Sequence, residues 1–140
     1  MYLLDTNVVS EFRKIQTGKA HPHVVSWADT AEAEDMFLSA ISVQELELGI
    51  LQLERRDSKQ GAILRQWLDL KVIPTFAGRI LPIDTAVARR SAQLSVPNPR
   101  PAHDGLIAAT ALVHNMTVVT RNVADFQSCG VSIVNPWNSI

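Results

Sequence analysis

The sequence predicts an α/β fold built on a mainly parallel sheet. Short apolar, β-branched stretches alternate along the chain with longer segments whose apolar residues recur at helical steps. Strands that alternate with helices in this way form right-handed βαβ units. The chain has 140 residues and contains no repeat, low-complexity run or dividing linker, so one domain is expected over residues 1–140.

The first half of the chain opens on a buried strand that ends at Asp5, and Thr6 and Asn7 then begin a helix. Pro22 suits the first position of the next helix. In order, the expected elements are a strand over residues 2–4, helices over 6–13 and 23–34, a strand over 36–40, a helix that Ser42 opens, and a helix over 62–70.

The second half is expected to begin with a short or edge strand over residues 79–83, because it contains Pro82. Three prolines then mark a stiff loop at Pro97, Pro99 and Pro101. The remaining expected elements are helices over 85–94 and 102–114 and strands over 117–120 and 131–134. The helix over 102–114 is apolar on most faces, which predicts that it is largely buried.

Composition restricts the class of protein. At 46% hydrophobic and 19% charged residues, the chain is typical of a globular domain. Its only cysteine, Cys129, excludes an internal disulfide and a cysteine-based zinc site, and favours a reducing, cytoplasmic location. Neither a signal peptide nor a membrane span is expected. The net charge of −1 counts mildly against avid binding to bulk nucleic acid but does not exclude an enzyme that contacts a few phosphates.

Carboxylates occur where apolar stretches meet helix starts or loops. They lie in four segments, Leu3–Asn7, Ser42–Leu46, His103–Ile107 and Thr120–Phe126. Ligands of parallel sheets bind beyond the carboxyl ends of the strands. That rule places Asp5 and Asp125 at one edge, and it allows Glu45 and Asp104, in the first turns of their helices, to join them. Oxygen-only sites suit Mg²⁺ or Mn²⁺, which serve phosphoryl chemistry.

Each acid also has a purely structural interpretation. Asp5 suits a helix N-cap. Ser42-x-x-Glu45 matches a capping box, in which the serine caps the helix and the glutamate bonds back to it. Asp104 would interact favourably with its helix N-terminus, and Asp125 is an ordinary loop residue. His103 borders Asp104, and a capping or surface role is favoured for it.

Taken together, the four segments resemble the PIN domain, specifically the ribonuclease toxins of the VapC family and, among them, FitB-like toxins. The likeness runs from Leu3 to Trp137. It includes the opening Leu-Leu-Asp-Thr-Asn-Val, the middle Ser-Ala-Ile-Ser-Val-x-Glu-Leu, the stretch Phe76–Pro82, the segment Asp104–Ala111 and the closing Asn-Pro-Trp. Four such motifs in order are far more specific than any one alone.

This resemblance implies a three-layer α/β/α sandwich and an endoribonuclease that depends on Mg²⁺, with Mn²⁺ as a substitute. It implies a toxin that a cognate VapB-like or FitA-like antitoxin inhibits, that forms a homodimer, and that reaches operator DNA only through the antitoxin. RNA would be the substrate, and no membrane is involved.

The same resemblance assigns residues. Asp5 and Asp104 match the principal metal ligands and Glu45 the third acid. The family's fourth acid often stands where this chain has Asn122, so Asp125 either replaces it or the fourth carboxylate is missing. Asn7, Thr120 and Asn122 are expected to support the acids, and Arg13, Lys14 and Arg121 are candidate contacts to phosphate.

Other functions remain open at this stage. The chain could act mainly as an antitoxin-binding partner in an operator-binding autorepressor, with weak or no nuclease activity. Keeping both Asp5 and Asp104 favours an enzyme. A haloacid-dehalogenase phosphatase would need an aspartate at Asn7, and a receiver domain would need acid and lysine spacings that are not evident. A DNase of the wider nuclease superfamily is a further alternative.

Overall fold

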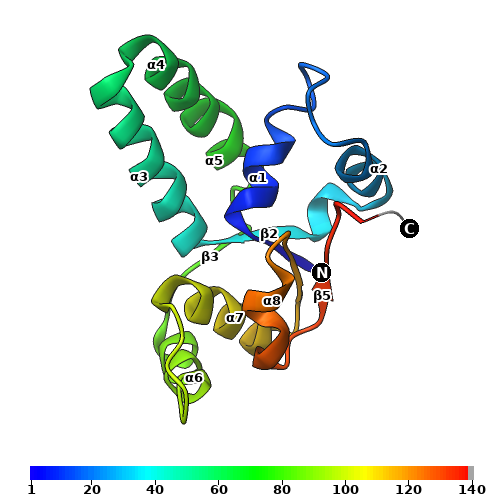
Figure 1. Ribbon diagram of the computed structural model, residues 1–140, viewed down its shortest axis with the longest axis vertical. Coiled ribbons are helices and arrows are strands. Elements are labelled where there is room, and N and C mark those ends of the chain that lie inside the picture. Colours follow the sequence, from blue (N-terminus) through cyan, green and yellow to red (C-terminus); the bar gives the residue numbers. More distant parts are fainter. Residues whose placement is uncertain (139–140) are drawn as a thin grey trace.

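A five-stranded parallel sheet forms the centre of the computed structural model, which describes residues 1–138 (Figure 1). The strands lie in the order β3-β2-β1-β4-β5, and all four pairings are parallel. Their bounds are β1 Tyr2–Leu4, β2 Met36–Ser39, β3 Ile80–Leu81, β4 Thr117–Val119 and β5 Ile133–Val134. The predicted parallel α/β fold and the edge position of β3 are confirmed.

Two hydrophobic cores lie on opposite faces of this sheet, which gives the predicted three layers. Side chains alternate between faces along a strand, so Leu3 enters one core and Leu4 the other. Val118 and Val119 divide in the same way. Figure 1 shows α1 to α5 on one side of the sheet and α6 to α8 on the other. Both faces of a parallel sheet are therefore covered.

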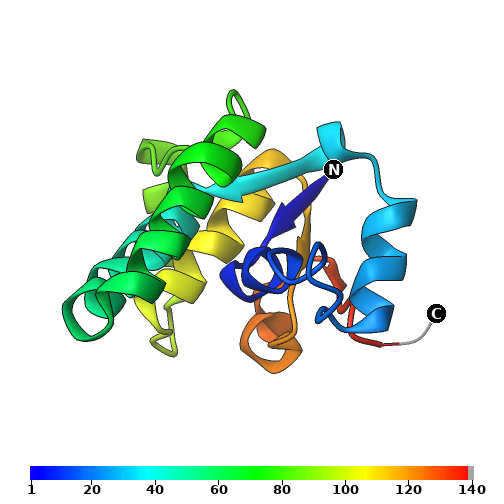
Figure 2. The ribbon, with the colours of Figure 1, turned by 90° about the horizontal axis from the view of Figure 1, so that it is seen from above.

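The helices are α1 Thr6–Phe12, α2 Pro22–Thr30, α3 Ala40–Arg56, α4 Ser58–Trp67, α5 Ile73–Thr75, α6 Thr85–Leu94, α7 Ala102–His114 and α8 Val123–Phe126. Three short segments complete them: the 3₁₀ turns η1 Ala33–Asp35 and η3 Gln127–Cys129, and the π-helix η2 Leu68–Val72. Helices α3 and α4 form an antiparallel pair at the side of the molecule away from α2 (Figures 1 and 2). No helix within residues 1–138 is long and apolar enough to cross a bilayer.

Several predicted boundaries were wrong. The expected helix over 23–34 ends at Thr30, and the expected helix over 62–70 begins at Ser58, because Asp57 caps it. The capping box at Ser42 is absent: Ser39 caps α3, its Oγ accepting from the Ile41 amide at 3.0 Å. Ser42 is instead fully buried inside α3. Helix α8 was missed because its four residues are too few for a periodic pattern.

The topology determines where side chains gather. Asp5 follows β1, and α3 begins directly after β2. Thr120 follows β4 and opens the loop that leads to α8. Helix α7 runs back to the amino end of β4, so its own N-terminus lies at the carboxyl edge. The ends of β1, β2 and β4 and the starts of α1, α3 and α7 therefore meet at one edge of the sheet.

Candidate active site

Asp5 is at the centre of the carboxyl edge, and it is only 6% exposed. It caps α1, with Oδ1 accepting from the Thr6 amide at 2.8 Å. Oδ2 accepts a 2.8 Å hydrogen bond from the Thr120 hydroxyl and a 3.3 Å bond from the Asn7 amide nitrogen. The structure therefore confirms the capping role predicted for Asp5. Its Oδ2 atom contacts Thr120, at the end of the neighbouring strand β4.

The supporting residues connect the two central strand ends. Asn7 Oδ1 accepts from the Arg121 amide at 3.4 Å, and Thr120 Oγ1 accepts from the Asn122 amide at 2.9 Å. Thr120 is fully buried, so its hydroxyl is held between Asp5 and the turn after β4. These bonds fix the loop between β4 and α8 against the start of α1.

Glu45 reaches the same edge from the second turn of α3, not from the first turn as the sequence suggested. Its Oε1 accepts a 2.7 Å hydrogen bond from the Thr6 hydroxyl. Its Oε2 lies 3.4 Å from Nδ1 of His103. The carboxylate therefore joins the starts of α1 and α7.

Asp104 lies in the first turn of α7, as predicted. Burial raises the pKa of Asp104, and repulsion from the Asp125, Asp5 and Glu45 carboxylates raises it further. Burial also raises the pKa of Asp5, against the hydrogen bond from Thr120, and Glu45 and Asp125 add to the rise. The four predicted acids thus share one electrostatic environment, and Asp125 acts more strongly on Asp104 than the other two do.

The chemistry of this set suits a hard divalent cation. No lysine or arginine within residues 1–138 forms an ion pair with Asp5, Asp104 or Asp125. His103, beside Glu45, opposes the rise in the pKa of Asp104. A bound cation relieves the repulsion among gathered carboxylates, and oxygen donors favour Mg²⁺ and Mn²⁺. Across the same residues, however, no three acidic, histidine or cysteine side chains lie close enough to form a ready-made metal group.

Two of the three predicted phosphate contacts lie away from the acids. Arg13 is at the C-terminal end of α1, whereas Asp5 caps its N-terminal end. Lys14 pairs with Glu11 at 3.1 Å. Arg121 follows β4 at the carboxyl edge, and its guanidinium lies 5.2 Å from the centre of the Trp137 ring. Of the three, Arg121 alone follows a strand end at the carboxyl edge, where its backbone amide donates to Asn7 Oδ1.

A continuous apolar groove lies between α1 and the α4–η2–α5 segment. Two adjoining pockets of about 210 and 400 Å³ form it, and both are lined by Phe12, Arg13, Trp67 and Lys71. Neither pocket is lined by the four acids. The groove is a second candidate surface, separate from the acidic edge.

Two residues touch Glu45 in a way that the sequence did not predict. Thr6 was expected to open its helix and to offer an oxygen beside Asp5, and a capping or surface role was favoured for His103 over a place near the site. Both contacts join segments far apart in the chain, 39 and 58 residues respectively. The adjacency of His103 to Asp104 was the one available signal.

Comparisons with known proteins agree with this geometry. A family model described as the PIN domain matches residues 2–128. Toxin FitB of Neisseria gonorrhoeae is 42% identical over 99% of this chain and 99% of its own. The VapC ribonuclease Y4jK of Sinorhizobium fredii is 37% identical over 98% of both chains.

A solved structure of FitAB bound to an IR36 DNA fragment superposes with a TM-score of 0.88. It is 40% identical and covers 100% of this chain and 98% of that one. The likeness therefore extends over the sheet, both helical layers and the acidic edge.

Proposed function

This chain belongs to the PIN-domain family, and on that premise we propose that it is the toxin of a toxin–antitoxin pair, an endoribonuclease dependent on Mg²⁺ or Mn²⁺. The observation that carries the proposal is the set of four carboxylates at the carboxyl edge, three of which form no ion pair with any lysine or arginine in the described part of the chain. Single-stranded or looped RNA is the proposed substrate.

Asp5, Asp104 and Glu45 would hold the ion, with Asp125 as the fourth carboxylate. When bound, such an ion polarises a water molecule, lowers its pKa and neutralises charge that gathers on the scissile phosphate. Thr6 and Thr120 keep the Glu45 and Asp5 carboxylates oriented through their hydroxyl groups. Arg121, at the carboxyl edge, is the cation proposed to meet a phosphate beside the acids. Arg13 and Lys14, at and just past the C-terminal end of α1, are proposed only for phosphates farther from the acids.

The cognate antitoxin is the proposed partner, because the similar FitB is a toxin and the matching solved structure is that of FitAB bound to DNA. Its docking segment is proposed to lie in the apolar groove, where Phe12 and Trp67 offer aromatic anchors and Arg13 and Lys71 attract acidic side chains. An antitoxin seated there inhibits the toxin. A homodimer, a cytoplasmic location and a single domain over residues 1–140 also remain proposals, and Ser139 and Ile140 lie outside the described residues.

A second candidate function is autorepression, because the matching FitAB structure holds a DNA fragment. In that role the chain would contribute mainly by binding the antitoxin, which alone contacts the operator. The two functions are compatible. RNA cleavage distinguishes an active toxin from a subunit that only binds the antitoxin.

The test is cleavage of a panel of purified RNAs by the free protein with Mg²⁺, with Mn²⁺ and with EDTA. Asp5→Asn serves as the inactive variant, because it keeps the size of the side chain while removing its charge. Arg89→Gln, a change of an exposed residue on α6, is the matched control.

We expect metal-dependent cuts from the wild type and the Arg89→Gln variant, and at least a hundredfold loss in Asp5→Asn. Cuts that persist in EDTA or in Asp5→Asn would contradict the assignment. No cleavage of any RNA, combined with antitoxin-dependent operator binding, would favour the autorepressor.

A further inference from the structure

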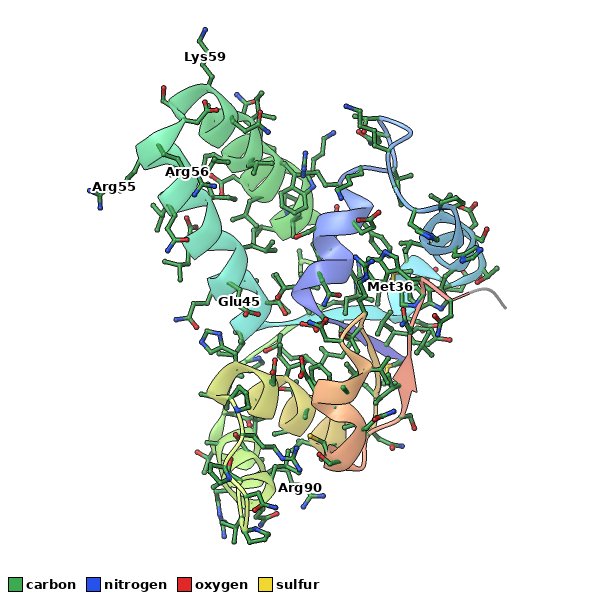
Figure 3. The ribbon with its side chains drawn as sticks, viewed as in Figure 1. Met36, Glu45, Arg55, Arg56, Lys59 and Arg90 are labelled. Carbon is green, nitrogen blue, oxygen red and sulfur yellow. The ribbon has the colours of Figure 1, made fainter. Side chains whose placement is uncertain are left out.

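The tip of the α3–α4 helix pair carries three cations that the proposed site does not use. Arg55 and Arg56 end α3, and Lys59 lies in the first turn of α4. All three are exposed, and within residues 1–138 no ion pair engages any of them. Figure 3 shows this basic tip at the end of the pair opposite Glu45.

The one acid within the basic tip is occupied. Asp57 Oδ1 accepts a 3.1 Å hydrogen bond from the Gln60 amide, which caps α4. Its amide donates to the Leu53 carbonyl at 2.8 Å, so the same residue closes α3. The tip thus presents three positive charges against the single Asp57 carboxylate, on a chain whose formal net charge is −1.

The helix pair is stiff enough to hold the tip at a fixed place. Arg65 of α4 pairs with Glu47 at 2.5 Å and with Glu54 at 3.1 Å, both on α3. Gly61 packs so closely on α3 that a Cβ there would lie 2.7 Å from the Glu54 Cα. Salt bridges and close backbone packing together join the two helices.

The same arginine partly offsets the negative charge that lies between the tip and the acids. Glu47 and Glu54 are the acids of α3 beyond Glu45, and Arg65 binds both. Glu45 and Arg56 are eleven residues apart on one α-helix, which is about 16 Å along its axis. Asp69 also lies 3.8 Å from Arg65, so this single positive charge offsets only part of the three negative charges beside α3. The tip is the end of α3 at which positive charge exceeds negative charge.

We propose that the basic tip Arg55–Arg56–Lys59 is a second contact for the RNA backbone, about 16 Å from the catalytic carboxylates. This inference rests on the proposed ribonuclease function and adds a substrate property: an efficient substrate is long enough to span both places. The contact is sequence-independent, because it is made to phosphates.

The test compares salt-dependent RNA binding by two forms of the full chain, each in an Asp5→Asn background that prevents cleavage. One carries Arg55→Gln, Arg56→Gln and Lys59→Gln together; its matched control carries Arg89→Gln and Arg90→Gln, two exposed cations of α6. The probes are a long stem-loop RNA and an oligoribonucleotide too short to span the distance. Circular dichroism verifies that helix content is unchanged.

For the long RNA, the triple variant should lower the slope of log affinity against log salt by about 2, since each phosphate contact contributes about 0.7 on a single strand. With the short RNA, the triple variant should give the same slope as the protein without these three changes. The control variant should leave the slope unchanged with either RNA. An unchanged slope and affinity in the triple variant would overturn the inference even if the wild type cleaves RNA.

The remaining outcomes separate this inference from the proposed function. A wild type that binds and cleaves no RNA would overturn both. Loss of operator binding by the antitoxin complex of the triple variant, with RNA binding intact, would assign the basic tip to DNA and overturn the RNA contact.

Discussion

The hydroxyl of Thr6 donates a 2.7 Å hydrogen bond to Oε1 of Glu45, 39 residues away in the chain. Thr6 follows Asp5 at the first strand end, whereas Glu45 projects from α3. The bond therefore joins the two elements that supply the first and third predicted metal ligands. It fixes a carboxylate that is otherwise only partly buried.

Replacing Thr6 with valine should impair cleavage without unfolding the protein. Valine keeps the shape of the side chain but cannot donate to Glu45, so the carboxylate loses its orientation. A displacement of about 1 Å at such a site costs up to about a hundredfold in rate. RNA cleavage rates measure the effect, and Thr6→Ser, which keeps the hydroxyl, should retain most activity. Full activity in Thr6→Val would mean that this bond does not position Glu45.

Asp125 should act as the fourth acid in place of Asn122. Asp125 makes the largest carboxylate contribution to the raised pKa of Asp104. Asn122 and Asp125 are both exposed, but the bonds described for Asn122 use only its backbone amide and carbonyl. We expect Asp125→Asn to lower cleavage at least tenfold and Asn122→Ala to change it less than threefold, as measured on one RNA at saturating Mg²⁺. The reverse ranking would place the fourth ligand at residue 122.

Asp104 should make the metal-free protein less stable as pH rises. The pKa of Asp104 in the folded state is raised above 3.8, its ordinary value in the unfolded chain. At a pH between the unfolded-state and folded-state pKa values, the folded state therefore holds more protons than the unfolded state. The Asp104 contribution to the free energy of unfolding therefore falls as pH increases through that window and stays low above it. Asp104→Asn removes this contribution.

The comparison of variant with wild type isolates Asp104, because other groups have their own pH dependence. The pKa of Glu11 is lowered, chiefly by a hydrogen bond from the His21 amide, so Glu11 stabilises the fold above its ordinary range and less in acid. We expect the stability of Asp104→Asn relative to wild type to grow with pH in EDTA, by urea unfolding. Mg²⁺ should cancel the difference or reverse it. A difference independent of pH would show that Asp104 is not held among like charges.

Gly61→Ala should destabilise the α3–α4 pair. The added Cβ would lie 2.7 Å from both the Cα and the Cγ of Glu54, and backbone cannot yield cheaply there. We expect a loss of about 1–3 kcal/mol in urea unfolding, despite the better helix propensity of alanine. Gly49→Ala in α3 is the matched control, since nothing lies within 4 Å of its Cβ position, and it should stabilise by about 1 kcal/mol. Equal changes in the free energy of unfolding for Gly61→Ala and Gly49→Ala would contradict the close approach of Gly61 to Glu54.

The fold was predictable because short apolar strand segments alternate along the chain with longer segments of helical periodicity. The strands at residues 2–4 and 117–119 are short, mainly apolar and bounded by polar residues, and the helices over 85–94 and 102–114 were predicted at their observed limits. Helix ends were harder where a cap competes with a pattern. Ser39 and Ser42 both suit an N-cap, and only the burial of Ser42 inside α3 decides between them.

The site was predictable as a set of segments, but its internal contacts were not. The strand-end rule brought Asp5 and Asp125 together from sequence order alone. The bonds from Thr6 and His103 to Glu45 depend on which way α3 and α7 turn their side chains, and no short-range pattern reports that. Arg13 shows the opposite failure: it is near Asp5 in sequence but at the other end of α1.

The most direct test of the central claim is a Mn²⁺ titration of the metal-free protein, in which the free ion is followed by electron paramagnetic resonance. The wild type should bind Mn²⁺, Asp104→Asn should bind it at least tenfold more weakly, and Mg²⁺ should displace it. Equal binding by wild type and Asp104→Asn, or no binding by either, would contradict a metal-dependent centre at the carboxyl edge.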